Sequence, residues 1–331
     1  MTNGEEQTGA GASPKSMVQS PKSSGAVRVL FLGDVCAEPG RKVVEQELAG
    51  LRQRLGVDFV IANGENAAGG YGITPVLADG LLKAGVGCIT TRDHAYDRKE
   101  VWEYLGTEPR ILRPLNFPPQ APGRGFGIYD CRLMNDEVAA GTEGTSGQGK
   151  VQNAEGKMAD AEQTAKVKVA VVSLQGRVFM KALDCPFRRA LPALDEIRRE
   201  TQVVFVDIHA EATAEKQAMG WFLDGRVSAV LGSHTHVQTA DEAILAGGTA
   251  YISDAGMCGS FDSVLGMSKD SSLRRMIEMV PVRLNPATGD VRINGVWVDV
   301  EPASGRALAI GRLSHPVAPA GNQTATGKRL T

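Results

Sequence analysis

Apolar, strand-like runs recur along this chain, and five of them are followed within a few residues by an acidic residue, an asparagine or a histidine. The first run, 27–32, leads across one glycine to Asp34. The later runs lead in the same way to Glu65 and Asn66, to Asp93 and His94, to His209, and to His234 and His236. Strands of an open α/β sheet present the residues after their carboxyl ends along one edge. The pattern therefore predicts an α/β fold in which separate segments bring metal-type ligands together.

The distribution of apolar segments also predicts how the chain divides. Strand-like and helical segments alternate through its first two thirds, whereas 249–300 is mostly strand-like with hairpin turns, and two packed sheets would accommodate this mixture. We predict one domain at 27–302, with a low-complexity insertion at about 135–165 that is more simply a solvated loop than a functional lid. We expect 1–26 to be a disordered tail and 303–331 to be a poorly patterned one.

Composition argues against several function classes. The 36 Lys and Arg residues and 38 Asp and Glu residues give a formal net charge of −2, so no global charge attracts nucleic acid or an anionic membrane. The five cysteines are widely spaced and odd in number, which argues against a disulfide framework and favours a reducing compartment. No segment has the apolar character of a signal peptide or a membrane span. We expect a cytoplasmic protein without stable binding to nucleic acids or membranes.

Four of the five histidines lie in three short motifs. His94 ends Thr-Arg-Asp-His, His209 lies in Asp-Ile-His-Ala-Glu, and His234 and His236 form Gly-Ser-His-Thr-His, whereas His315 lies near the C-terminus. A single histidine after a strand is more often structural than a ligand, but alternation in an extended segment would put His234 and His236 on the same side. Taken together, these imidazoles and the nearby carboxylates favour a site for transition-metal ions.

The order of these motifs resembles a known superfamily. Gly-Asp at 33–34, Gly-Glu-Asn at 64–66, the following histidines and Gly-x-His-x-His at 232–236 are similar to the calcineurin-like metallophosphoesterases. Longer matching segments such as 63–73 resemble its YmdB-like branch, which is known as bacterial 2′,3′-cyclic-nucleotide phosphodiesterases. The resemblance covers about residues 27–300 apart from the insertion. It implies an α/β fold of the four-layer α/β/β/α sandwich type with two metal ions, often iron or manganese.

The resemblance also implies a role for each site residue by position. The assignments are, for the first metal ion, Asp34, Asn66 and His236; for the bridge between the ions, Glu65; for the second ion, His209, His234 and Asp93; and for the general acid, His94. A bridging hydroxide would attack the phosphorus, because coordination to a metal lowers the pKa of water. The general acid would give a proton to the leaving oxygen. The expected activity is hydrolysis of small cyclic nucleotides such as 2′,3′-cAMP.

The chain departs from the family at one site position. The family carries Gly-Asn-His where this chain carries Arg92-Asp93-His94. Asp93 keeps an oxygen ligand but offers no N–H donor to a phosphate, and its charge would repel an anionic substrate. Arg92 would offset this charge by pairing with Asp93 or by reaching the phosphate, unless it is a surface arginine. Arg92 and Arg177 are therefore candidate substrate-binding residues, with a structural ion pair as the alternative role of Arg177.

Two other functions fit the same motifs. The same metal centre would also suit a phosphomonoesterase or nucleotidase. Because Asp93 replaces the family asparagine, the chain is alternatively a metal-bound regulatory protein of low activity. The partner of either enzyme is a small phosphodiester or nucleotide, and we expect a homo-oligomer because related proteins commonly form one. We also expect Cys36 to be a small buried residue in a turn rather than a metal ligand, and Phe179 to pack in the core rather than stack on a base.

Overall fold

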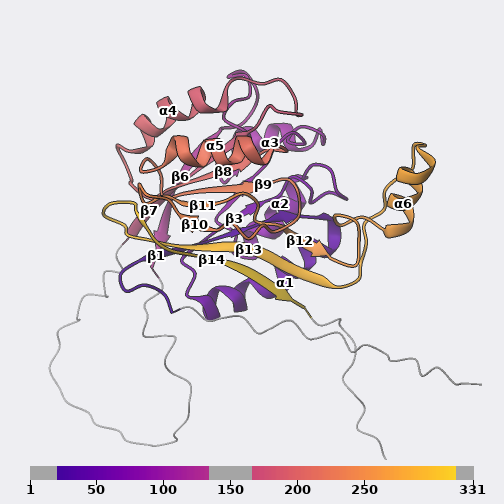
Figure 1. The fold of residues 1–331 in the computed structure, drawn as a ribbon, viewed down its shortest axis with the longest axis horizontal. Helices are drawn as coiled ribbons and strands as arrows, with labels where there is room; N and C mark the ends of the chain where they lie inside the picture. Colours follow the sequence, from indigo (N-terminus) through magenta and orange to yellow (C-terminus); the bar gives the residue numbers. More distant parts are fainter. Residues whose placement is uncertain (1–20, 134–165, 318–331) are drawn as a thin grey trace, which may run out of the picture.

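The computed structural model describes residues 21–133 and 166–317, which form two β-sheets flanked by helices (Figure 1). The first sheet has eight strands, seven of them in the order β2 (Asp34–Val35), β12 (Met257–Ser260), β13 (Val291–Val300), β1 (Val27–Leu32), β3 (Phe59–Asn63), β4 (Cys88–Thr90) and β5 (Ile111–Leu112). The eighth, β14 (Ala307–Pro316), pairs antiparallel with β13. The second sheet has the order β10 (Ala243–Ile244), β11 (Ala250–Ile252), β9 (Ala229–Ser233), β8 (Val204–His209), β7 (Lys166–Gln175) and β6 (Phe126–Arg132).

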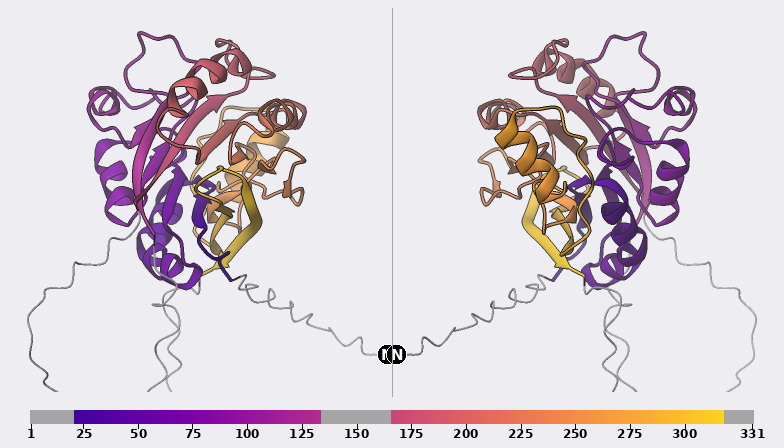
Figure 2. Two further views of the ribbon diagram at one scale, coloured as in Figure 1. Left: turned by 90° about the vertical axis from the view of Figure 1, so that its left-hand side faces the viewer. Right: turned by 90° about the vertical axis from the view of Figure 1, so that its right-hand side faces the viewer.

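Helices cover the outer face of each sheet (Figures 1 and 2). The first sheet is covered by α1 (Ala37–Leu55), α2 (Pro75–Lys83) and α3 (Val101–Thr107). The second sheet is covered by α4 (Pro186–Ile197) and α5 (Thr213–Leu223). The remaining helix, α6 (Lys269–Glu278), projects away from the body of the molecule (Figure 1). Across both described ranges, no helix reaches the length and apolarity that a bilayer crossing needs.

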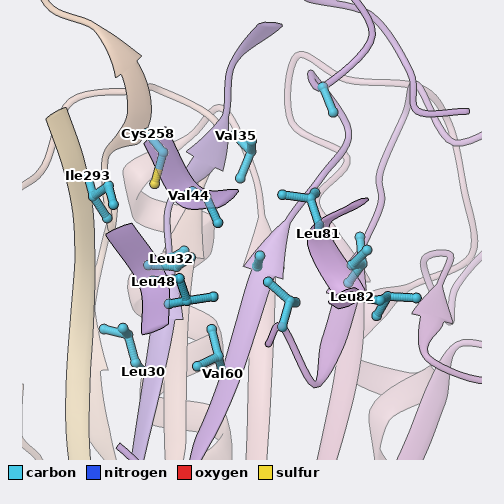
Figure 3. Packing of buried hydrophobic residues seen from close by; sticks show 14 of the residues in the cluster. Leu30, Leu32, Val35, Val44, Leu48, Val60, Leu81, Leu82, Cys258 and Ile293 are labelled. Carbon is cyan, nitrogen blue, oxygen red and sulfur yellow. The ribbon is translucent and has the colours of Figure 1, made fainter. Parts of the chain in front are cut away.

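The alternation of side chains along β1 shows how the layers form. Leu30 and Leu32 belong to a core cluster that includes Leu48 of α1, and Figure 3 shows these three side chains close together. Val29 and Phe31 point the other way, into a cluster between the two sheets. A third cluster joins the second sheet to α4 and α5. Three apolar layers between four layers of secondary structure confirm the predicted α/β/β/α sandwich.

Parallel pairing brings the ends of the central strands together. In the first sheet β1 is parallel to β3, and β3 is parallel to β4. In the second sheet β7, β8 and β9 are parallel, with His209 opposite Ser233 at the ends of β8 and β9. Because side chains and backbone after parallel strands share one edge, the segments that carry the predicted ligands gather at one end of the sandwich.

The domain boundaries differ from the predicted ones. The tail predicted from residue 303 is wrong for 307–316, which forms β14 and pairs along β13. Its alanine- and glycine-containing sequence has a weak strand propensity, so its order comes from pairing rather than from local preference. At the other end Lys22 forms an ion pair of 2.7 Å with the buried Asp58, so the last residues of the predicted disordered tail pack on the domain. The predicted insertion and the outer parts of both tails lie outside the described residues.

Candidate metal centre

His209, the last residue of β8, lies at the centre of a group of metal-type ligand atoms. Its side chain is fully buried, and its Nε2 atom lies 2.8 Å from Oε1 of Glu65 and 2.8 Å from Nδ1 of His234. Oδ1 of Asp93 is 3.6 Å from the same nitrogen. One ligand atom from each of Glu65, His209 and His234 lies within 4.8 Å of the others. Lone pairs that face one another at such distances repel unless a proton or a cation lies between them.

The residues assigned to the first metal ion also lie together. Nε2 of His236 is 3.1 Å from Nδ2 of Asn66 and 4.0 Å from Oδ1 of Asp34. Asp34 is fully buried, and Nδ2 of Asn63 donates to its Oδ1 over 2.9 Å. A half-turn of the Asn66 amide would present its oxygen in place of its nitrogen. The structure thus brings together all the residues that were predicted from the sequence to be metal ligands.

His234 and His236 reach the site through an irregular backbone. Their φ angles are 110° and 63°, so the predicted extended alternation is wrong for this segment. A left-handed backbone costs a residue with a side chain on the order of 1–3 kcal/mol and persists only where its surroundings hold it. Here the backbone N–H of His234 donates to Oδ2 of Asp34 over 3.2 Å, and that of Thr235 donates to Oδ2 of Asp254 over 2.9 Å. These carboxylates hold the loop in a conformation that the sequence pattern does not show.

The donor atoms fit transition-metal ions. Oε2 of Glu65 and Oδ1 of Asp93 are buried and have no hydrogen-bond partner among the described residues. Burial, followed by the nearby charge of Asp93, raises the pKa of Glu65 to about 8, because a buried carboxylate without a compensating charge is unstable. Bound cations would supply that charge, and imidazole and carboxylate ligands suit iron, manganese or zinc. Cys36 is buried and its pKa is raised to about 12, chiefly by burial, which agrees with the expected small buried residue.

A layer of polar residues behind His209 was not predicted. Oγ of Ser233 lies 3.0 Å from Nδ1 of His209 and donates to Oδ1 of Asp207 over 2.9 Å. Thr90 donates its hydroxyl hydrogen to Oδ2 of Asp207 over 2.6 Å. Such contacts to the non-ligating ring nitrogen set the orientation and basicity of a ligand histidine. The only sequence signal for this layer is the presence of polar residues inside otherwise apolar strands.

Arg92 belongs to this inner layer and not to the open site. Its side chain is fully buried and forms an ion pair with Asp207, and Nη1 contacts the Thr91 carbonyl and the Ser173 hydroxyl. The predicted roles of substrate contact, partner of Asp93 and surface arginine are therefore wrong. The cause is the carboxylate of Asp207 inside the sandwich, because a buried guanidinium needs a charged partner. Arg92 thus stabilises the polar layer that supports His209, and it does not serve to bind a phosphate.

A buried ion pair holds the His234–His236 loop from the other side. Nζ of Lys216 in α5 lies 2.8 Å from Oδ2 of Asp254, and both side chains are buried. Asp254 also accepts hydrogen bonds from the backbone N–H groups of Thr235 and Gly256, each over 2.9 Å. The carboxylate therefore links the loop to α5.

Replacing Lys216 should destabilise the protein strongly. In Lys216→Met the Asp254 carboxylate stays buried without its counter-charge, so the free energy of unfolding should fall by about 3–5 kcal/mol. Urea denaturation of both proteins measures the difference. Lys168→Met is the control, because Lys168 pairs with Glu200 on the surface and its loss should change the unfolding midpoint little. Equal midpoints for Lys216→Met and the wild type would contradict the structural role of the pair.

His94, the predicted general acid, lies beside the ligand group. Its Nδ1 is 2.6 Å from Oδ2 of Asp97, and its Nε2 is 3.7 Å from Oδ2 of Asp93. The ring of Tyr71 packs edge-on against the His94 ring, with 5.3 Å between centroids. Because Asp97 holds Nδ1, the other ring nitrogen faces the ligand group and is available for proton transfer.

The segment after β7 is anchored to the same site at both ends. The N–H of Gly176 donates to the His209 carbonyl over 2.8 Å, and Nζ of Lys181 donates to the Asp93 carbonyl over 2.6 Å. Between these anchors Phe179 is 89% exposed, so the expected core packing is wrong. The Arg177 side chain is exposed, with Nη2 3.6 Å from Sγ of Cys185, and no contact links it to the ligand group in the described structure. Its role in substrate binding stays a prediction.

Comparison with known proteins identifies similar chains. The family model described as "YmdB-like protein" matches residues 30–146 and 147–313. The 2′,3′-cyclic-nucleotide 2′-phosphodiesterase of Bacillus subtilis (strain 168) is 38% identical over 287 residues, which cover 87% of this chain and 96% of that protein.

Two solved structures have the same fold. The crystal structure of a hypothetical protein from Thermus thermophilus has a TM-score of 0.72 and 38% identity, covering 88% of this chain and 99% of that one. A novel phosphatase from Mycoplasma pneumoniae has a TM-score of 0.72 and 26% identity, covering 88% of this chain and 94% of that one. The similarities confirm the predicted resemblance and the predicted class, a hydrolytic phosphoesterase.

Proposed function

We propose that this chain, which belongs to the YmdB-like family, hydrolyses the cyclic phosphodiester of small nucleotides such as 2′,3′-cAMP at a centre of two metal ions. The observation that carries the proposal is the convergence of ligand atoms from Glu65, His209 and His234 next to His94. The activity named for the similar Bacillus subtilis protein supports this choice of substrate class.

The ligand atoms divide into two groups that share Glu65. Asp34, Asn66 and His236 would hold one ion, and His209, His234 and Asp93 would hold the other. Glu65 contacts His209 through Oε1, while its Oε2 is buried without a partner among the described residues, so the carboxylate can serve both groups. When bound, two such ions lower the pKa of water and neutralise charge on the phosphoryl oxygens.

His94 would protonate the leaving group. Hydrolysis of a 2′,3′-cyclic phosphate breaks a bond from phosphorus to a ribose oxygen, and that oxygen needs a proton as it leaves. Asp97 lies 2.6 Å from Nδ1 of His94 and favours the tautomer with a proton on that nitrogen in the neutral ring. The protonated imidazolium then carries its transferable proton on Nε2, which faces the ligand group.

The direct test measures metal content and turnover on one sample. About two iron or manganese ions per chain together with hydrolysis of 2′,3′-cAMP would support the proposal. Comparing bis(p-nitrophenyl) phosphate with p-nitrophenyl phosphate separates it from the alternative of a phosphomonoesterase. A protein that takes up no metal, even after reconstitution with iron or manganese, would overturn the proposal. The homo-oligomeric state, the cytoplasmic location and the native metal pair stay predictions.

The alternative of a regulatory protein with low activity depends on Asp93. Burial opposes ionisation of this carboxyl, but His209 and the other nearby histidines hold its pKa well below the usual range, so Asp93 carries a negative charge beside the ligand group. An ionised carboxylate at this position repels an anionic substrate.

Asp93→Asn should therefore raise kcat/KM for 2′,3′-cAMP, on the order of tenfold, because it removes one repulsive charge a few Å from the phosphate. Steady-state kinetics with metal content measured on the same preparation tests this prediction. Asp262→Asn makes the same chemical change at an exposed ion pair with Lys269 and should leave kcat/KM unchanged. No gain in Asp93→Asn, in a fully metal-loaded protein, would show that Asp93 does not suppress turnover.

A further inference from the structure

A cavity of about 370 Å³ lies beside the loop that follows β3. Three arginines line it: Arg98, which follows the His94 segment, Arg275 in α6, and Arg283 in the segment after α6. Tyr71 and Asn285 add polar groups to the wall. No carboxylate is among the described residues that line the cavity, so its charge is strongly positive.

The three arginines have no acidic partner within the described parts of the chain. Two other arginines do pair: the exposed Arg274 with Glu278, and the half-buried Arg292 with Asp290. Arg98 instead donates to two backbone carbonyls of the loop, those of Ala68 over 2.7 Å and Tyr71 over 3.1 Å. Like charges that share a cavity repel one another, and a bound anion relieves that repulsion.

The cavity adjoins the proposed centre through Tyr71. This residue lines the cavity, and its ring packs against the ring of His94 with 5.3 Å between centroids. His94 is the residue that would protonate the leaving oxygen, so the cavity lies on the side of the leaving group. The right-hand view of Figure 2 shows α6, which carries Arg275, in front of the body of the molecule.

We propose that this cavity binds the 5′-phosphate of a nucleotide whose 2′,3′-cyclic phosphate occupies the metal centre. The inference rests on the proposed function. The leaving group of a 2′,3′-cyclic phosphate is an oxygen of the ribose. The 5′ carbon of the same ribose lies at its other end, away from the reacting phosphorus. Guanidinium groups bind phosphate through charge-assisted hydrogen bonds, often two at a time. The preferred substrate class is therefore a nucleotide with phosphate at both ends of the ribose.

The test is a binding comparison between two product-like ligands on the metal-loaded protein. Isothermal titration gives Kd for adenosine 3′-phosphate and for adenosine 3′,5′-bisphosphate. The bisphosphate should bind about tenfold to a hundredfold more tightly, as expected for added charge-assisted hydrogen bonds. The double variant Arg275→Ala/Arg283→Ala should lose most of this advantage. Arg274→Ala, the neighbouring arginine of α6 that pairs with Glu278 outside the cavity, should retain it.

The ratio of the two Kd values separates this inference from the proposed function. Any change in the metal centre affects both ligands alike and leaves the ratio unaltered. Equal Kd values in the wild type, or an unchanged advantage in the double variant, would overturn the phosphate site. Turnover of 2′,3′-cAMP is measured separately, so a protein without cyclic-phosphodiesterase activity can still show the advantage of the 5′-phosphate.

Discussion

His209→Ala should remove bound metal and, with it, hydrolysis of 2′,3′-cAMP. Nε2 of His209 lies within 2.8 Å of ligand atoms from both Glu65 and His234, so its loss opens the ligand group at its centre. Metal ions contribute several kcal/mol of transition-state stabilisation, and kcat/KM should fall on the order of a thousandfold. Elemental analysis of the purified protein and steady-state kinetics measure the two effects.

His315→Ala provides the matched control. His315 lies in β14, outside the three histidine motifs, and its Nε2 lies 3.5 Å from Oε2 of Glu47. This variant should keep its metal and its activity, which shows that losing an imidazole is not in itself damaging. Circular dichroism should confirm that His209→Ala is folded, because the substitution also leaves a buried space. A folded His209→Ala protein with full metal content would contradict the assignment of His209 as a ligand.

The sequence predicted which residues would lie together, because each of them lies at or soon after the end of a strand-like run. An apolar run such as 27–32 has few arrangements that bury both of its faces, so the sequence specifies where the strand ends. The residue after the run then lies at the edge of the sheet. The positions of Asp34 and Glu65 in the first sheet, and of His209 in the second, follow from parallel pairing within each sheet rather than from the conformation of any one loop. The four layers were expected from the family resemblance, and the division of alternate β1 residues between two core clusters agrees with them.

The errors concern features that depend on distant partners. Arg92 turns inward because Asp207, far along the chain, offers it a buried carboxylate, and no local pattern shows that contact. The left-handed φ angles of His234 and His236 are maintained by contacts from other elements, among them the Asp34 carboxylate. The order of β14 comes from pairing with β13 and not from its own composition. Local sequence thus predicts where ligands emerge, whereas side-chain direction depends on tertiary partners.

His94→Ala tests proton donation, and the size of the loss should depend on the leaving group. Hydrolysis of 2′,3′-cAMP expels a ribose oxygen that needs a proton, so kcat should fall by about 10²–10⁴, the usual contribution of a general acid. Bis(p-nitrophenyl) phosphate releases p-nitrophenolate, which is stable without a proton, and the same variant should lose much less activity on it. Comparing kcat for both substrates in the same preparation measures this difference.

The leaving-group comparison also separates proton donation from other roles of His94. Because His94 lies 3.7 Å from Asp93, its removal can also disturb the ligand group, but that disturbance would slow both substrates to the same extent. Metal content measured on the variant gives an independent reading of the same effect. Because Asp97 contacts Nδ1 over 2.6 Å, Asp97→Asn should show a smaller loss with the same selectivity for 2′,3′-cAMP. Equal losses on both substrates in His94→Ala would assign this histidine a positioning role and leave the proton donor to another group.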